Sequence, residues 1–133
     1  NMIKKYYIKT ITLLLMIPFM MFLCACNNTT NIADSSIGQL NYNYDNKHIS
    51  VILTEAESNI VKDIFNKKEL YNDEPSCGFD KNISINFDND YYCIACDSCG
   101  IVKFKDKYFN ISNSERSKVE KIFKKYGGTF PCV

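Results

Sequence analysis

Two segments of this chain carry the same helix-start pattern, 58 residues apart. Each places a Ser or Thr three residues before a Glu, as in Thr54 with Glu57 and Ser112 with Glu115. This spacing forms a capping box, which satisfies two backbone amide donors at the start of a helix. Val, Ile and Phe then recur at helical spacing within residues 53–65 and 111–123. The pattern predicts two amphipathic helices, and either internal duplication or the shared physics of helix formation accounts for their likeness.

Short runs of alternating apolar and polar residues predict strands before and between the two helices. The runs cover residues 48–53, 83–87, 91–97, 102–105 and 108–111. Consecutive strands favour an antiparallel sheet with helices on one face. We therefore expect an α+β domain over residues 47–133. It should contain an antiparallel sheet of four to five short strands packed by two amphipathic helices, in the order β-α-β-β-β-β-α.

The N-terminal segment has the organisation of a targeting sequence. Lys4, Lys5 and Lys9 supply its charge, and Ile11–Leu23 is almost wholly apolar and interrupted by Pro18. This apolar run is shorter than the ~20 residues that span a bilayer. A basic region followed by a short apolar core is typical of a secretory signal peptide. We assign residues 1–25 to such a peptide; the alternative is an uncleaved N-terminal anchor helix.

The residues Leu23-Cys24-Ala25-Cys26 follow the apolar run and resemble the bacterial lipobox. The resemblance implies that the Cys26 thiol receives a diacylglycerol, that a peptidase cuts before Cys26, and that Cys24 is discarded. Two acyl chains give stable membrane anchoring, whereas one chain is marginal. We expect a lipoprotein on the extracytoplasmic face of the cell membrane, with the covalent lipid on Cys26 in place of any other cofactor.

The segment after the lipidated cysteine is polar and rich in asparagine. Residues 27–46 contain six Asn together with Ser, Thr, Asp and Gly, which predicts a flexible tether over residues 26–46. Tyr42 and Tyr44 alternate with Asn41 and Asn43, so an extended edge segment is expected at its end. Loss of residues 1–25 leaves 13 Lys+Arg against 15 Asp+Glu. This mildly acidic balance offers no basic patch for nucleic acid.

Five cysteines belong to the mature chain: Cys77, Cys93, Cys96, Cys99 and Cys132. Export permits disulfides, and an odd number leaves at least one thiol outside the intrachain pairs. A hairpin that turns at residues 88–90 brings Cys77 and Cys99 together at its open end, so we favour that pair. Cys132 then pairs with Cys93 or with Cys96.

The spacing Cys93-x-x-Cys96-x-x-Cys99 also suggests chemistry. Two overlapping C-x-x-C units suggest thiol–disulfide exchange, and three thiols suggest a zinc site. On a strand, however, Cys93 and Cys99 share one face while Cys96 points to the other. Structural disulfides are therefore the favoured interpretation. An extracytoplasmic thiol–disulfide or metal-handling protein that uses these three residues is the alternative.

No catalytic constellation stands out in the sequence. His48 is the single histidine, and the sequence places no nucleophile beside it. Asp88-Asn89-Asp90 lacks the Gly and distal Glu of an EF-hand loop, so a solvated turn is expected there. Gly127-Gly128 follows a helix and does not open one, unlike a phosphate-binding loop. We expect a protein that is not an enzyme and has no catalytic residue.

Three segments of the domain, at residues 94–100, 111–112 and 126–133, are similar to small uncharacterised lipoproteins and secreted proteins of clostridia and other Firmicutes. The resemblance implies that Cys77, Cys99 and Cys132 are structural and that Cys93 and Cys96 are additions in this chain. Lys outnumbers Arg 15 to 1, which is typical of AT-rich Gram-positive genomes. We expect an envelope lipoprotein that binds a protein or cell-wall partner.

Overall fold

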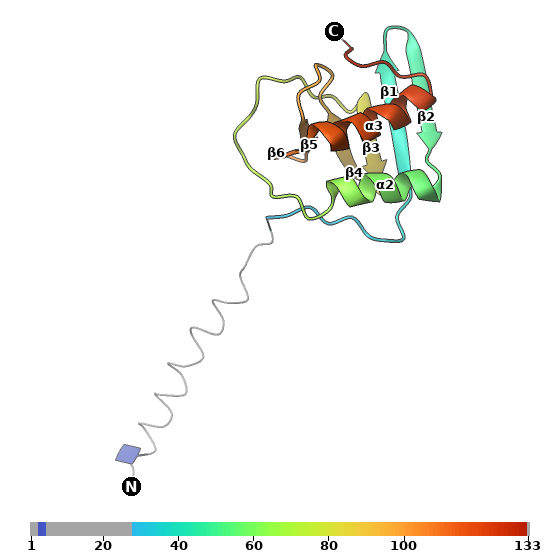
Figure 1. Cartoon of the computed structure of the whole chain (residues 1–133). Coiled ribbons are helices and arrows are strands. Elements are labelled where there is room, and N and C mark those ends of the chain that lie inside the picture. Colours follow the sequence, from blue (N-terminus) through green and yellow to red (C-terminus); the bar gives the residue numbers. More distant parts are fainter. Residues whose placement is uncertain (1–2, 5–27, 133) are drawn as a thin grey trace.

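One antiparallel sheet of six strands carries two helices on the same face (Figure 1). The structure is a computed structural model and describes residues 3–4 and 28–132. Along the chain, the elements are β1 (Gly38–Tyr44), β2 (Lys47–Ile52), α2 (Glu55–Phe65), β3 (Ile83–Phe87), β4 (Asp90–Ile94), β5 (Ile101–Phe104), β6 (Lys107–Asn110) and α3 (Asn113–Lys125). The strands lie in the order β2-β1-β3-β4-β5-β6, and all neighbours are antiparallel. The α+β fold class expected from the sequence is confirmed.

Both helices begin at the capping boxes that the sequence predicts. The Glu57 amide donates to Thr54 Oγ1 at 3.2 Å, and the Thr54 amide donates to Glu57 Oε2 at 3.0 Å. Ser112 and Glu115 repeat both bonds at the start of α3. α3 ends at a left-handed glycine, Gly127, whose φ is +104°. This conformation lets the following amides reach the last carbonyls of the helix.

The hydrophobic core fills the space between the helices and the sheet. Tyr92 lies at its centre, with its ring centroid 5.3 Å from that of Phe65 on α2 and 4.7 Å from that of Phe104 on β5. Aromatic pairs of this kind contribute about 0.5–1.5 kcal/mol beyond the area that they bury. The largest fully buried apolar and aromatic side chains of the described residues are Tyr42, Tyr92, Phe65, Phe109, Phe123, Leu40, Ile85, Val61, Val102 and Val119.

The expectation of a flexible tether over residues 26–46 is wrong for the part from residue 28 onward. β1 lies inside the sheet, between β2 and β3, and is a central strand with no free edge. Leu40 and Tyr42 are 0% exposed and face the helices. Between them, Asn41 points to the other face, where its side-chain amide donates to Asn86 Oδ1 at 2.9 Å. Two of the asparagines that suggested a tether, Asn41 and Asn43, therefore lie on the polar face of a central strand.

Two disulfides tie the loop between β4 and β5 to two other segments of the chain. One links Cys77 to Cys99, the pair favoured from the sequence, with the Cα atoms 6.8 Å apart. The other links Cys96 to Cys132, with the Cα atoms 5.1 Å apart. The resemblance set Cys96 apart from the structural cysteines, whereas here Cys96 is the partner of Cys132, one of the two partners left open by the sequence. Among the described cysteines, Cys93 alone is unpaired.

Candidate functional site

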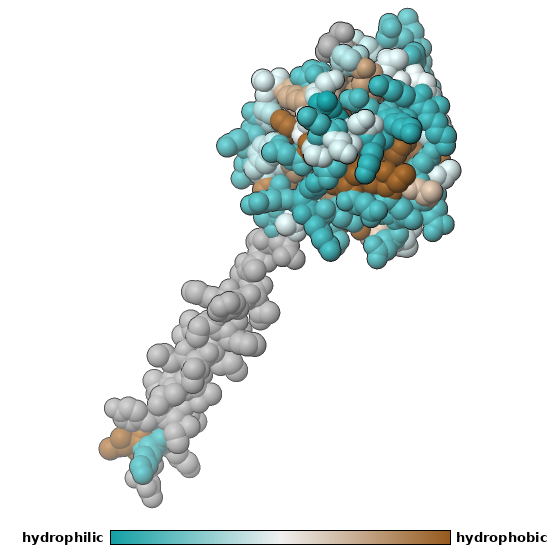
Figure 2. Space-filling view, in the orientation of Figure 1, coloured by the Kyte–Doolittle hydropathy of each residue, from teal (hydrophilic) through white to brown (hydrophobic). Residues whose placement is uncertain are grey.

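The two helices leave an open groove between them, on the side turned away from the sheet. The groove has a volume of about 750 Å³. Figure 2 shows a hydrophobic area between the helices, ringed by hydrophilic residues. The lining residues are Glu57, Ile60, Asp63 and Ile64 from α2, and Glu115, Lys118, Lys121, Ile122 and Lys125 from α3. An apolar concave surface framed by charges is the usual form of a protein-binding groove.

Ile60 is the most solvent-exposed of the apolar residues that line the groove. It is 42% exposed, although the following Val61 is 0% exposed. Successive helical residues are about 100° apart around the axis, so Val61 faces the sheet while Ile60 faces the groove. The position 58 residues later is Lys118, on the opposite wall. The groove was not expected from the sequence, although this one-residue widening of the apolar stripe on α2 is a signal for it.

One end of the groove is held by a buried carboxylate. Glu57 is 7% exposed and bridges α2 to the end of α3. The ammonium group of Lys125 donates to its Oε1, and the Tyr126 hydroxyl donates to its Oε2 at 2.7 Å. Burial by itself raises the pKa of Glu57, but the hydrogen bonds from Lys125, Tyr126 and the Thr54 amide lower the pKa to about 2. Glu57 is therefore ionised at neutral pH.

The other end of the groove repeats this arrangement in the opposite direction. Lys68, just beyond the end of α2, donates to both carboxylate oxygens of Glu115 at 2.9 and 3.0 Å. Burial opposes ionisation of Glu115, but the Ser112 amide and Lys68 lower its pKa. The two capping-box glutamates thus tie each helix start to the end of the other helix. The helices are antiparallel, and their spacing is fixed by charged contacts at both ends.

Between these ends the groove walls carry opposite charges. Asp63 stands on the α2 wall, and Lys118 and Lys121 stand on the α3 wall. Within the described part of the chain, none of these three side chains takes part in an ion pair. The apolar floor, formed mainly by Ile60 and Ile122, therefore lies between an acidic wall and a basic wall.

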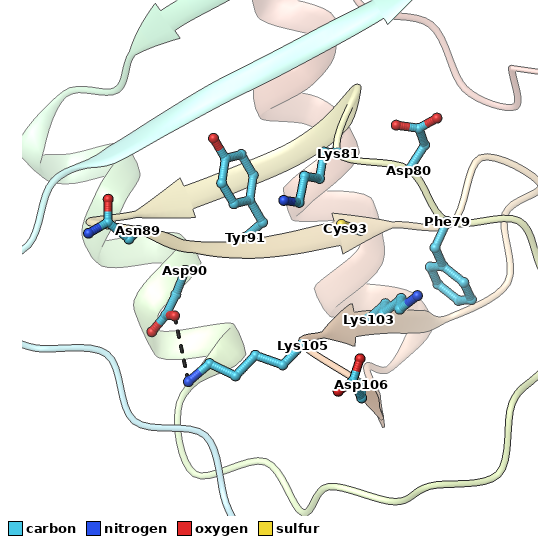
Figure 3. A pocket seen from close by; sticks show the side chains of 10 residues that line it. All are labelled: Phe79, Asp80, Lys81, Asn89, Asp90, Tyr91, Cys93, Lys103, Lys105 and Asp106. Carbon is cyan, nitrogen blue, oxygen red and sulfur yellow. Dashed lines mark ion pairs between the residues drawn. The ribbon is translucent and has the colours of Figure 1, made fainter.

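A second, smaller pocket of about 390 Å³ lies on the opposite face of the sheet (Figure 3). Cys93 forms its floor and is 7% exposed. Burial raises the pKa of the Cys93 thiol, an effect that the nearby Lys103 partly offsets. The thiolate is the reactive form of cysteine, so a thiol that stays protonated at neutral pH is a poor nucleophile.

The structure does not bring Cys93, Cys96 and Cys99 together as a set of thiols. Cys96 and Cys99 belong to different disulfides, and only Cys93 remains reduced. Among the described residues, ligand atoms of Cys77, Asp97 and Cys99 lie within 4.8 Å of one another. The two sulfurs of this group are bonded to each other, so they are not available as thiolate ligands.

The remaining sequence candidates lie apart from both pockets or outside the described residues. His48 is exposed on β2, with Nδ1 3.3 Å from Asn43 Oδ1 and no nucleophile in that hydrogen bond. Asp88 forms the turn between β3 and β4 and accepts a hydrogen bond from the Ser36 hydroxyl at 3.0 Å. Cys26 lies outside the described residues. The lipidation of Cys26 therefore stays a prediction.

Within the described residues, no helix is long and apolar enough to cross a membrane. Comparisons with protein-family models, curated proteins and solved structures give no match to this chain.

Proposed function

We propose that this chain is a non-enzymatic envelope lipoprotein, anchored to the extracytoplasmic face of the cell membrane through a diacylglycerol on Cys26, whose domain binds protein through the groove between α2 and α3. The observation that carries the proposal is the exposed apolar floor of the groove, above all Ile60 at 42% exposure. Full burial of an Ile side chain is worth about 1.5–3 kcal/mol, so an occupant gains free energy by covering it.

The sequence around Cys26 supports the anchor, and the start of the domain fits it. Asn28, two residues after Cys26, is already part of the fold. The Leu70 amide donates to the Asn28 carbonyl at 2.9 Å, and the Asn28 side chain donates to the Leu70 carbonyl at 2.7 Å. Lys107 also donates to Asn28 Oδ1 at 2.7 Å. A lipid on Cys26 would therefore hold the domain close to the bilayer surface.

The shape and charge of the groove favour a protein occupant with a helical contact surface. An amphipathic helix presents apolar residues on one stripe and charged residues on its flanks, and such helices commonly fill grooves between two helices. Here the occupant needs an apolar stripe for Ile60, basic groups for Asp63, and acidic groups for Lys118 and Lys121.

Substitution of Ile60 tests the role of the groove. Ile60→Glu places a charge on the apolar floor, so bound protein should be lost by at least about tenfold. Lysine-reactive cross-linking of intact cells that produce the full chain, followed by mass spectrometry, measures cross-links from Lys118 and Lys121. Ile52→Glu is the matched control, because Ile52 is 67% exposed on β2 outside the groove. Unchanged intermolecular cross-links at Lys118 and Lys121 in Ile60→Glu would contradict the proposal.

Substitution of Cys26 tests the anchor. Cys26→Ala should accumulate as the unprocessed chain and take up no radiolabelled palmitate, because the thiol that accepts the lipid is gone. Cys24→Ala is the control, since Cys24 lies in the segment expected to be removed. Labelling of Cys26→Ala, or an equal loss of labelling in both variants, would show that Cys26 is not the lipidated residue.

The alternative function, thiol–disulfide exchange or metal handling through Cys93, Cys96 and Cys99, would need those residues as thiols. The two disulfides leave it only Cys93. Mass spectrometry of the native, alkylated protein distinguishes the two proposals. One modified cysteine favours the binding module, whereas three modified cysteines or bound zinc favour the alternative.

A further inference from the structure

We propose that the groove is occupied by a second copy of this chain, in a dimer whose two-fold axis runs parallel to α2 and α3. This inference rests on the proposed function of the groove as a protein-binding surface and names its partner. The support comes from the register of charges along the two walls and from the place where the chain enters the domain.

The contacts at the groove ends set the register of the two helices. Glu57 of α2 contacts Lys125 of α3, and these residues mark a common level along the groove. With a rise of about 1.5 Å per residue, Asp63 lies about 9 Å along α2 from that level. On the antiparallel α3, Lys121 and Lys118 lie about 6 and 10.5 Å from the same level. Asp63 is therefore level with a position between the two lysines on the opposite wall.

A two-fold axis parallel to the helices preserves these levels and exchanges the walls. Each α2 then faces α3 of the other copy when the two grooves are placed against each other. Asp63 of one copy meets the partner's Lys118 and the partner's Lys121, and the reciprocal contact forms by symmetry. Ile60 lies about 4.5 Å from the common level, as does Ile122, so Ile60 covers the partner's Ile122. Asp63, Lys118 and Lys121, which form no ion pair within the described part of one copy, thus find groups of opposite charge on the other copy.

A second way to place the two grooves against each other, with a different two-fold axis, brings like charges together. A two-fold axis perpendicular to the helices places α2 against α2 and α3 against α3. The α3 lysines would then face the partner's lysines, and Asp63 would face the acidic wall of the partner. Like charges across an interface disfavour association. The charge pattern therefore selects the parallel axis.

The position of Asn28, where the chain enters the domain, favours the same two-fold axis. Asn28 is hydrogen-bonded to Leu70 and Lys107, at the end of the groove where α2 ends and α3 begins. Figure 1 shows the chain entering the domain beside this end of α2. A two-fold axis parallel to the helices puts both Asn28 residues at the same end of the dimer. Two lipid anchors on Cys26 can then enter one bilayer, which the perpendicular axis would prevent.

Charge reversal tests the inference. The full lipidated chain is examined by sedimentation equilibrium in a detergent that is matched to the solvent density. We expect a dimer for the unaltered chain. Asp63→Lys should weaken dimerisation by at least about tenfold, and Lys118→Asp with Lys121→Asp should do the same, because attraction becomes repulsion at two symmetric sites. The triple variant should restore the dimer, because each reversed charge again faces its opposite. Asp73→Lys, an exposed residue outside the groove, is the control and should leave the dimer intact.

Two results would overturn the inference. The first is a monomeric chain at every concentration. The second is a dimer that neither single-wall variant weakens, which would indicate association through the lipids or another surface. The cross-linking experiment with Ile60→Glu keeps the two proposals apart. A monomeric chain whose cross-links to a different protein depend on Ile60 retains the groove as a binding site and rejects the second copy. If the Ile60→Glu variant keeps both the dimer and the intermolecular cross-links, both proposals are rejected.

Discussion

A single carboxylate, Glu57, joins three parts of this molecule. It completes the capping box of α2 with Thr54, and it accepts hydrogen bonds from Lys125 and Tyr126 at the end of α3. The width of the groove thus depends on a residue whose first role is local. Glu115 has the same two roles at the other end, through Lys68. The groove is kept open by charged contacts at its ends while its centre stays apolar.

The pKa of Glu57 makes stability depend on pH. Its folded pKa of about 2 lies below the ordinary value of 4.5, so its contribution is complete above pH ~5 and is lost as the pH falls toward ~2. Once screening by the solvent in the open groove is taken into account, the lowered pKa of Glu57 corresponds to roughly 2 kcal/mol of folding free energy. Glu57→Gln should therefore lower the free energy of unfolding at pH ~7 by about that amount, and it should flatten the acid-side decline. Urea denaturation over a pH series measures both effects.

Glu55→Gln is the matched control for this prediction. Glu55 lies in the first turn of the same helix and is exposed. Its loss removes the same formal charge without breaking the contacts between helices. If Glu57→Gln and Glu55→Gln gave the same pH profile, the bridge from Glu57 to Lys125 and Tyr126 would not be the source of the acid sensitivity.

At the scale of elements, the sequence predicts what local patterns determine. Both helices were expected from capping boxes and apolar spacing, and they begin where Thr54 and Ser112 place them. The hairpin turn at residues 88–90 was expected from its composition and joins β3 to β4. β1 was not expected as a central strand, because every second residue over 39–43 is Gln or Asn. Cross-strand neighbours satisfy the Gln39 and Asn41 amides: Gln39 donates to Ser50 on β2, and Asn41 donates to Asn86, far along the chain on β3.

The groove could not be predicted, because it depends on how the two helices lie side by side. At the 58-residue offset, the buried positions match: Val61 with Val119 and Phe65 with Phe123. The flanking positions differ, and Asp63 corresponds to Lys121. Core positions stay alike because each helix must fill the same space above the sheet. The difference in charge between Asp63 and Lys121 affects binding only once the two helices lie side by side as the walls of a groove.

At the scale of the whole molecule, the two halves of the sheet have the same plan. The hairpin β1–β2 leads into α2, and the hairpin β5–β6 leads into α3. Each hairpin places its second strand at an edge of the sheet, while β3 and β4 pair in the middle. The antiparallel helices follow from this arrangement, since each helix returns across the sheet from an opposite edge. Internal duplication and shared physics both remain consistent with the plan.

The place of residues 28–46 in this plan leads to a prediction about where the domain begins. Among the described strands, β1 alone pairs with β2, and it also pairs with β3. A chain that begins at Lys47 lacks β1, so β2 loses its place in the sheet. It also loses Leu40 and Tyr42, both 0% exposed. Removal of one large core side chain costs about 2–5 kcal/mol, and the total stability of a domain is about 5–15 kcal/mol.

The truncated chain 47–133 should therefore not fold, whereas the chain 28–133 should unfold cooperatively. Thermal unfolding followed by circular dichroism, together with the dispersion of amide proton signals, distinguishes the two. The comparison is matched, because both chains lack the N-terminal segment and both keep all four disulfide cysteines. A cooperative transition in the chain 47–133 would mean that β1 is dispensable, and the boundary first expected from the asparagine-rich composition would then be the correct one. If the chain 28–133 folds and the chain 47–133 does not, β1 belongs to the folded domain, and the lipid proposed on Cys26 would then hold the groove near the membrane surface.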